Sequence, residues 1–143
     1  MMAGHRLATA PAHALIVDDE PVVRLILTHL LTTRLRCRAT AVSSGDEALP
    51  VLDTDRPDLL VVDDTLPGMN GLDVAREARR RLPTLPLVLI PAILDQQDIR
   101  QLRQEGLIYA SVRKPFDAER LLEMLDVTLA KWPRDRRFPH ATE

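Results

Sequence analysis

The chain has 143 residues, 45% of them apolar, which is enough for one domain with its own core and no need of disulfides or a structural metal. Its formal net charge of -2 gives no electrostatic footprint for nucleic acid and no polybasic stretch for a membrane surface. The charge therefore predicts no direct nucleic-acid partner. Because no apolar run approaches the roughly eighteen residues needed to cross a bilayer, we expect a cytoplasmic protein with no membrane partner.

Short β-type runs alternate with longer helical patterns from the beginning of the chain. The first strand is predicted at residues 14–17, and apolar residues at helical spacing follow from Pro21 toward Thr33. A second strand is predicted at residues 38–43. This alternation is typical of βαβ units and therefore predicts an α/β fold with a parallel sheet.

The second predicted helix contains a proline. Ser44 and Glu47 have the spacing of a capping box, which opens a helix that extends through Leu52. Pro50 removes a backbone donor from this helix and crowds the preceding turn. We therefore expect the helix to be short, kinked or displaced.

The second half of the chain continues the alternation. The predicted elements are strands at 59–62, 87–90 and 109–112, and helices at 72–81, at 95–105 and from a cap at Asp117 to near Trp132. These elements complete five strands and five helices in one domain over residues 12–132. Residues 1–11 and 133–143 lack apolar periodicity, and we expect them to be flexible.

Three carboxylates stand where predicted strands end. Asp18 and Asp19 follow the first strand, and Asp63 follows the third. If both strands are parallel and buried, all three acids meet at the carboxyl edge of the sheet, where open α/β folds bind their ligands. Neighbouring carboxylates repel one another, and a hard divalent cation removes that repulsion. The sequence therefore predicts a Mg2+ site at this edge.

Lys114 stands just past the fifth strand, at the same edge as the acids. An aspartate can attack a phosphorus centre and form an acyl phosphate if a metal and a fixed cation neutralise the transferred group. A compact ammonium acts on phosphate as a point charge, so Lys114 is the candidate for that cation. Together with the acids, it indicates a phosphoryl-transfer site.

Three motifs resemble one family. Residues 15–21 (LIVDDEP), residues 57–63 (PDLLVVD) with 67–71 (PGMNG), and residues 114–116 (KPF) closely resemble the CheY-like receiver domain of bacterial two-component response regulators. The resemblance covers residues 12–131 and is greatest to receivers that stand alone or are attached to hybrid histidine kinases. It implies a doubly wound, flavodoxin-like sheet of five parallel strands in the order 2-1-3-4-5, with five helices.

The resemblance implies that Asp63 accepts a phosphoryl group from a sensor histidine kinase or phosphotransfer protein. Pro67, four residues on, fixes that register, so that Asp64 is not the acceptor. Lys114 would pair with the phosphoryl oxygens. The implied function is phosphorelay signalling through contact with a downstream protein, with at most self-phosphorylation and self-dephosphorylation on Asp63 and no turnover of external substrates.

The resemblance also implies the ligands of the metal. Asp19 and Asp63 would bind Mg2+ directly, and Asp18 would act mainly through bound water. Thr65 would contribute its backbone carbonyl. Mg2+ is thus the expected cofactor of the phosphoryl transfer.

The switch positions depart from the family pattern. Receivers normally carry Ser or Thr at the end of the fourth strand, where this chain has Pro91, followed by the expected small residue at Ala92. The aromatic switch position is Ser111, with Tyr109 two residues earlier. Asp64 adds a charge where an apolar residue is usual, which we expect to alter metal affinity or loop packing. We predict slower phosphoryl transfer and an unusual switch.

Two other functions remain open at this point. The first is a pseudo-receiver that binds a protein partner independently of phosphorylation. The second is a phosphatase of the haloacid dehalogenase type, suggested by residues 63–65 (DDT), although the Asp-x-Asp spacing of that family is absent. Any homodimer is expected to form through the fourth helix, fifth strand and fifth helix, which are the usual contact surface of receivers.

Overall fold

A computed structural model describes residues 11–131, and the structural statements below concern these residues. Five parallel strands form one sheet in the order β2-β1-β3-β4-β5. The strands are β1 (His13–Val17), β2 (Arg38–Val42), β3 (Leu59–Asp63), β4 (Leu87–Ile90) and β5 (Ala110–Ser111). Every residue of β1, β3 and β4 is buried, as expected for parallel strands covered on both faces. The predicted fold class and strand order are confirmed.

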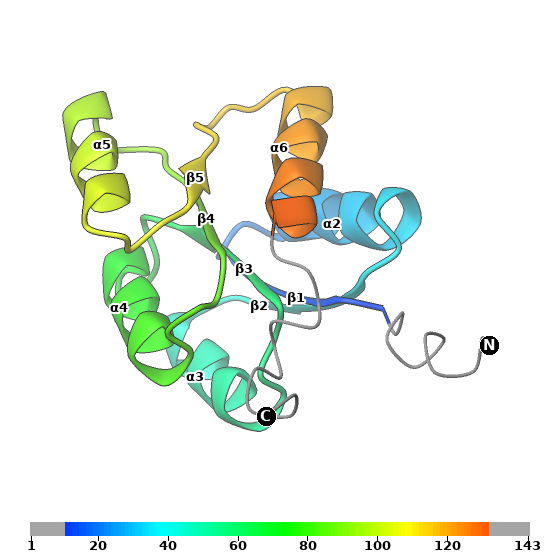
Figure 1. The fold of residues 1–143 in the computed structure, drawn as a ribbon, viewed down its shortest axis with the longest axis horizontal. Coiled ribbons are helices and arrows are strands. Elements are labelled where there is room, and N and C mark those ends of the chain that lie inside the picture. The colour runs from blue at the N-terminus through cyan, green and yellow to red at the C-terminus, as the bar shows by residue number, and fades with distance from the viewer. Residues whose placement is uncertain (1–10, 132–143) are drawn as a thin grey trace.

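Helices cover both faces of the sheet (Figure 1). They are α2 (Pro21–His29), α3 (Gly45–Thr54), α4 (Gly71–Arg81), α5 (Gln96–Gln104) and α6 (Ala118–Lys131), and a π-helical turn, η1 (Leu30–Arg34), continues α2. The helices α2 and α6 pack on one face, where Leu27 and Leu121 are buried. The helices α3, α4 and α5 pack on the other face, where Leu52, Val74 and Ile99 are buried. The sheet therefore separates two apolar layers.

The α3 helix differs from its prediction. It continues through the proline to Thr54, so Pro50 does not interrupt it. The Pro50 side chain is exposed, which leaves the ring in solvent rather than in the core. The capping pattern is also displaced by one residue: Ser44 accepts the Glu47 N–H at 3.2 Å, but the Glu47 carboxylate accepts the N–H of Ser43, not of Ser44.

Two other boundaries differ from the sequence prediction. The α-helical part of the first helix ends at His29 and the chain continues as the π turn to Arg34, beyond the predicted end at Thr33. The last strand, β5, spans two residues instead of the four predicted, and it pairs only with β4 at the edge of the sheet. The predicted flexible segments lie outside the described residues, except for Pro11. None of the helices between residues 11 and 131 combines the length and the apolar character that a membrane span requires.

The strand register brings distant acids to one edge. Val17 of β1 is paired with Val62 of β3, so Asp18 and Asp63 follow directly at neighbouring positions. Asp63 is paired with Ile90 of β4, which places the β4–α5 loop beside the end of β3. The carboxyl edge of the sheet is therefore formed by the residues after β1, β3, β4 and β5.

Candidate phosphoryl-accepting site

Lys114 lies at the centre of a group of acids. Its Nζ is 2.8 Å from Asp18 Oδ2, 3.1 Å from Asp63 Oδ2 and 2.9 Å from Glu20 Oε2. The Asp18 and Asp63 side chains are only 1% and 2% exposed, and that of Lys114 is 10% exposed. Buried charges require close partners, and here one ammonium serves two buried carboxylates. The structure thus brings Asp18, Asp63 and Lys114 together, as the sequence predicted.

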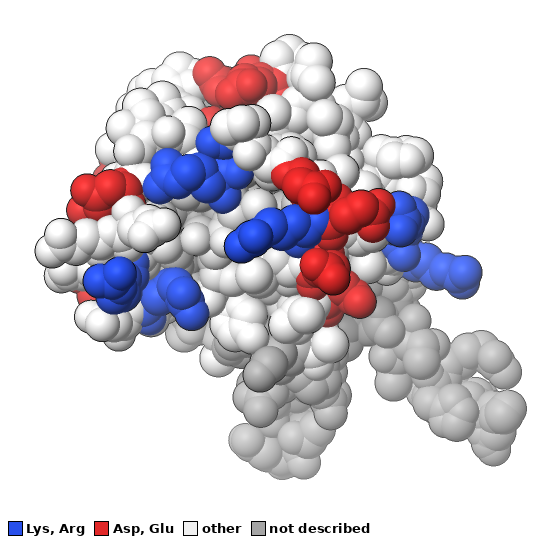
Figure 2. Space-filling model, turned by 90° about the horizontal axis from the view of Figure 1, so that it is seen from above, with Lys and Arg blue, Asp and Glu red and all other residues white. Residues whose placement is uncertain are grey.

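Asp19 and Glu20 add two exposed carboxylates to this group. One oxygen from each of Asp18, Asp19, Glu20 and Asp63 lies within 4.8 Å of the others. Figure 2 looks down on the carboxyl edge and shows a compact group of Asp and Glu side chains with Lys and Arg on either side. Clustered carboxylates with an open side suit Mg2+, which takes one or two protein carboxylates and keeps several waters. The donor set therefore fits this metal.

The electrostatic environment of Asp63 raises the pKa of its carboxyl group toward neutral pH. Burial raises the pKa of Asp63 to about 6, and the charge of Asp18 adds to the rise, while Lys114 opposes both. For Lys114, burial alone would lower the pKa, but hydrogen bonds to Asp18, Glu20 and Asp63 outweigh it and raise the pKa above its ordinary value. Lys114 is therefore always charged, and Asp63 is the group whose charge responds to its surroundings.

The backbone after β3 approaches the start of α4 so closely that only glycine fits. A Cβ on Gly71 would lie 1.8 Å from the carbonyl oxygen of Asp63, and the Gly71 N–H donates to the Asp64 carbonyl oxygen at 3.2 Å. The Thr65 N–H donates to Asp63 Oδ1 at 3.3 Å, on the other carboxylate oxygen from the one that Lys114 contacts. These contacts fix where the Asp63 carboxylate points.

The chain matches the response regulator receiver domain family over residues 14–126. It belongs to this family. It is 35% identical to the chemotaxis protein CheY of Pseudomonas aeruginosa, in a match that covers 78% of this chain and 91% of that protein. It is 32% identical to the DNA-binding transcriptional regulator NtrC of Klebsiella pneumoniae over 87% of this chain.

A solved structure supports the same assignment. The signal receiver domain of an HD domain-containing protein from Pseudomonas fluorescens Pf-5 is 26% identical and superimposes with a TM-score of 0.77, covering 86% of this chain and 98% of that chain. The match to NtrC spans only 26% of that protein's length. Membership of the receiver family argues against the hypothesis of a haloacid dehalogenase phosphatase. Receiver domains generally bind Mg2+ at an acidic pocket such as this one.

Asp64 of this receiver domain has a different set of partners from its neighbour Asp63. Its Oδ1 accepts the N–H of Ala92 at 3.0 Å, and its Oδ2 accepts those of Ile93 at 2.9 Å and Leu94 at 3.0 Å. Burial raises the pKa of Asp64, but the three backbone N–H groups outweigh burial and lower the pKa to about 2. The sequence predicts that the Asp64 charge alters metal affinity or loop packing, and these contacts show an effect on loop packing.

Two atypical switch positions, Pro91 and Ser111, line the same cavity, and Tyr109 is not part of that cavity. Pro91 is buried at the end of β4, and its carbonyl accepts the Lys114 N–H at 2.8 Å. Ser111 is half-buried in β5 and lines a cavity of about 560 Å³ between α5 and the segment leading into α6. Tyr109, also half-buried, lies before β5 at the opposite edge of the sheet. The structure therefore does not bring Tyr109 to the acidic site.

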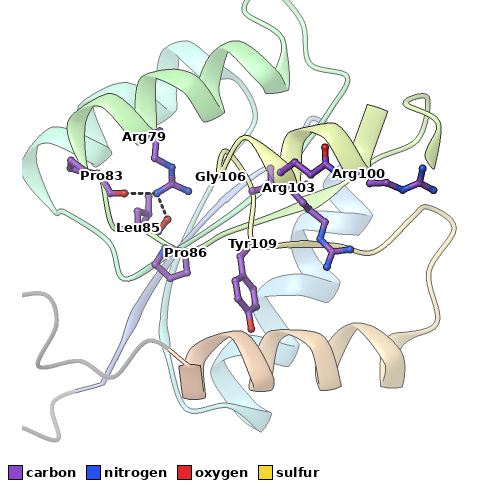
Figure 3. Close-up of a pocket in the computed structure, with 10 residues that line it drawn as sticks. Arg79, Pro83, Leu85, Pro86, Arg100, Arg103, Gly106 and Tyr109 are labelled. Atoms are coloured by element: carbon purple, nitrogen blue, oxygen red, sulfur yellow. Dashed lines mark hydrogen bonds between the residues drawn. The ribbon is translucent and has the colours of Figure 1, made fainter. Parts of the chain in front are cut away.

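The pocket beside Tyr109 is a structural feature separate from the acids. It has a volume of about 620 Å³ and lies between the carboxyl-terminal ends of α4 and α5 (Figure 3). Arg79 closes one side, with its guanidinium donating to the backbone carbonyls of Pro83, Leu85 and Leu107. Through the carbonyls of Pro83 and Leu85, Arg79 holds the loop before β4 in place.

Sequence reasoning gave no role to two residues of the site. Glu20 pairs with Lys114 at 2.9 Å, and its position directly after the Asp18-Asp19 pair was the available signal. Arg113 donates from its guanidinium to the Leu94 carbonyl in the β4–α5 loop. No local pattern predicts this second contact, because it joins residues that are nineteen apart in the sequence.

Proposed function

We propose that this receiver domain accepts a phosphoryl group on Asp63 from a phosphohistidine of a sensor kinase or phosphotransfer protein, and acts through contact with a downstream protein. The observation that carries the proposal is the position of Lys114 Nζ, which bridges the buried carboxylates of Asp63 and Asp18. A fixed cation beside a candidate nucleophile is what charge development on a transferred phosphoryl group requires.

In the transfer, a carboxylate oxygen of Asp63 would form the new bond to phosphorus while the bond from phosphorus to the donor's histidine nitrogen breaks. The Thr65 N–H and Lys114 Nζ hold the two oxygens of Asp63 in place before the donor arrives. Lys114 also pairs with the buried Asp18 carboxylate close to the nucleophile and would neutralise part of the charge on the transferred oxygens.

The proposed metal ligands are the carboxylates of Asp19 and Asp63, the backbone carbonyl of Thr65, and Asp18 through water. Mg2+ bound there would supply positive charge to the phosphoryl oxygens. Glu20 is exposed and belongs to the same group of acids, so it would add negative charge that attracts the cation. Because Asp18 is already paired with Lys114, its proposed role through water needs no change in that pair.

The face formed by α5, β5 and the start of α6 is the proposed contact surface for the downstream protein and for any homodimer. Exposed arginines gather there at Arg100, Arg103 and Arg120, with the half-buried Phe116 between the two helices. Cationic side chains around an aromatic ring favour an acidic partner surface. We propose residues 12–132 as the folded unit that carries both this face and the acidic site.

A second candidate function is a binding module that does not use phosphate. Pro91 favours it, because the position that normally offers a hydroxyl has neither a hydroxyl nor a backbone donor. The two functions differ in their dependence on the metal: the first predicts Mg2+ binding that Asp63→Asn weakens, whereas the second requires no Mg2+ binding at all.

The test is intact-protein mass spectrometry after incubation with a small phosphodonor and Mg2+. The first function predicts an adduct of one phosphoryl group that is absent without the donor and absent in Asp63→Asn. Asp126→Asn changes an exposed aspartate on α6 and is the matched control, in which the adduct should form as in the unmodified protein. No adduct under forcing conditions would reject the first function and leave the second.

A further inference from the structure

The β4–α5 loop, residues 91–95, is held on both sides by hydrogen bonds. On one side the Asp64 carboxylate accepts the three consecutive N–H groups of Ala92, Ile93 and Leu94 at 2.9 to 3.0 Å. On the other side the loop carbonyls are taken: that of Pro91 by the Lys114 N–H and that of Leu94 by the Arg113 guanidinium. Five hydrogen bonds thus fix a loop whose side chains at Ala92 and Ile93 are exposed.

We propose that Asp64 is a positioning residue that, with Arg113, holds the β4–α5 loop in one conformation whether or not Asp63 carries a phosphoryl group. The anchoring stands on the contacts themselves, and only its independence of phosphorylation rests on the proposed function. The loop leads directly into α5 and its arginines, so a fixed loop means a contact face that is already set.

Hydrogen-bond capacity is the first reason for this independence. Each backbone N–H makes one good hydrogen bond, and those of Ala92, Ile93 and Leu94 are already given to an ionised acceptor. A phosphoryl oxygen on Asp63 could gain them only by displacing a carboxylate that bonds them equally well. Since a ligand shifts an equilibrium only through its different affinity for the two states, such an exchange gives little drive for loop movement.

The residue at the end of β4 is the second reason. A side-chain hydroxyl at this position could be drawn toward the phosphoryl group, but Pro91 offers none. The Pro91 carbonyl is bonded to the backbone of Lys114, the residue whose side chain holds Asp63. The loop is therefore held by Asp64 and by the Arg113–Lys114 segment in the absence of any phosphoryl group.

The first experiment measures hydrogen exchange of single amides by NMR without Mg2+ or phosphodonor. Asp64→Ala should speed exchange at Ala92, Ile93 and Leu94 by roughly tenfold or more while the β3 amides keep their protection. Asp64→Asn, which retains one acceptor oxygen, should give an intermediate increase, and Asp126→Ala should give none. Equal exchange at these three amides in Asp64→Ala and the unmodified protein would overturn the anchor.

The second experiment adds Mg2+ and beryllofluoride, an acyl-phosphate analogue, and follows the same amide resonances. In the unmodified protein the resonances of Thr65 and Lys114 should move while those of residues 92–94 stay, and in Asp64→Ala both sets should move. Movement of residues 92–94 in the unmodified protein would overturn the proposal. If nothing moves at Thr65 or Lys114, the proposed function fails instead, and the exchange rates decide the anchor by themselves.

Discussion

Asp63 and Asp64 are adjacent in the chain, yet their carboxylates bond different partners at the carboxyl edge of the sheet. Asp63 Oδ2 is 3.1 Å from the ammonium of Lys114, whereas Asp64 Oδ1 is 3.0 Å from the backbone nitrogen of Ala92. Their environments also move the two pKa values in opposite directions, to about 6 and about 2. Asp63 is thus the proposed acceptor of the phosphoryl group, and Asp64 is the proposed anchor of the β4–α5 loop.

Asp63→Asn should stabilise the folded protein. Burial and the Asp18 charge disfavour the ionised carboxylate, and a shift of the pKa from 3.8 to about 6 corresponds to a penalty of up to about 3 kcal/mol at neutral pH. The amide removes this charge and can still accept a hydrogen bond from Lys114. Urea unfolding at neutral pH without Mg2+ measures the gain, and a less stable variant would contradict the assigned penalty.

The charge of Asp63 should titrate near pH 6 in the metal-free protein. Because its folded pKa lies above its unfolded value of 3.8, the folded state binds more protons between these pH values. Stability from this group therefore falls as the pH rises through this window. NMR titration of the side-chain carboxyl carbon gives the midpoint, and added Mg2+ should lower it.

Asp64 should show the opposite pH dependence. Its folded pKa of about 2 lies below the unfolded value of 3.8, so its contribution is present above 3.8 and lost as the pH falls toward 2. Asp64→Ala should remove about 2 kcal/mol of unfolding free energy at neutral pH, since three backbone donors lose their acceptor. The measurement is the unfolding free energy of the variant and of the unmodified protein at neutral pH and near pH 2.5. The difference between the two proteins should be smaller at the lower pH.

Lys114→Met should destabilise the metal-free protein by about 3 kcal/mol, because the buried carboxylates of Asp18 and Asp63 lose their counter-charge. Mg2+ should recover part of that loss, since a bound cation replaces the ammonium. Arg100→Met removes an exposed cation on α5 and should change stability by less than about 0.5 kcal/mol. Thermal unfolding with and without Mg2+ compares the variants, and equal stabilities would contradict the central place given to Lys114.

Gly71→Ala should disrupt the proposed acceptor site more than Gly106→Ala. A Cβ at Gly71 would lie 1.8 Å from the Asp63 carbonyl oxygen, so the backbone must shift. At Gly106 nothing lies within 4 Å, and the positive φ of 79° alone costs about 1 kcal/mol. Unfolding free energies and Mg2+ affinity separate the two variants, and an unchanged Mg2+ affinity in folded Gly71→Ala would contradict its role in placing Asp63.

The elements near the acids were predictable because local patterns determine them. Buried parallel strands appear as short apolar runs, and an acid directly after such a run must lie at the carboxyl edge. That reasoning places Asp18, Asp63 and Lys114 together at this edge. It misjudged Pro50, because a proline on an exposed helix face is tolerated when the apolar face of the helix still packs, as it does at Ala48 and Leu52.

The partners of Asp64 could not be predicted from the sequence. The three N–H groups that it accepts are 28 to 30 residues away, and backbone donors leave no trace in the residue types that carry them. The unusual charge at this position was visible, but its effect depends on the path of a loop. Contacts between a side chain and a distant backbone segment are therefore visible only in the structure, and sequence motifs do not predict them.

The most direct test is to locate the phosphoryl group after reaction with a small phosphodonor and Mg2+. Reduction of the acyl phosphate converts the modified aspartate to homoserine, which peptide mass spectrometry identifies at a single position. We predict homoserine at position 63 and unmodified aspartate at position 64. Homoserine at position 64, or at neither position while the protein remains folded, would contradict the assignment of Asp63 as the acceptor.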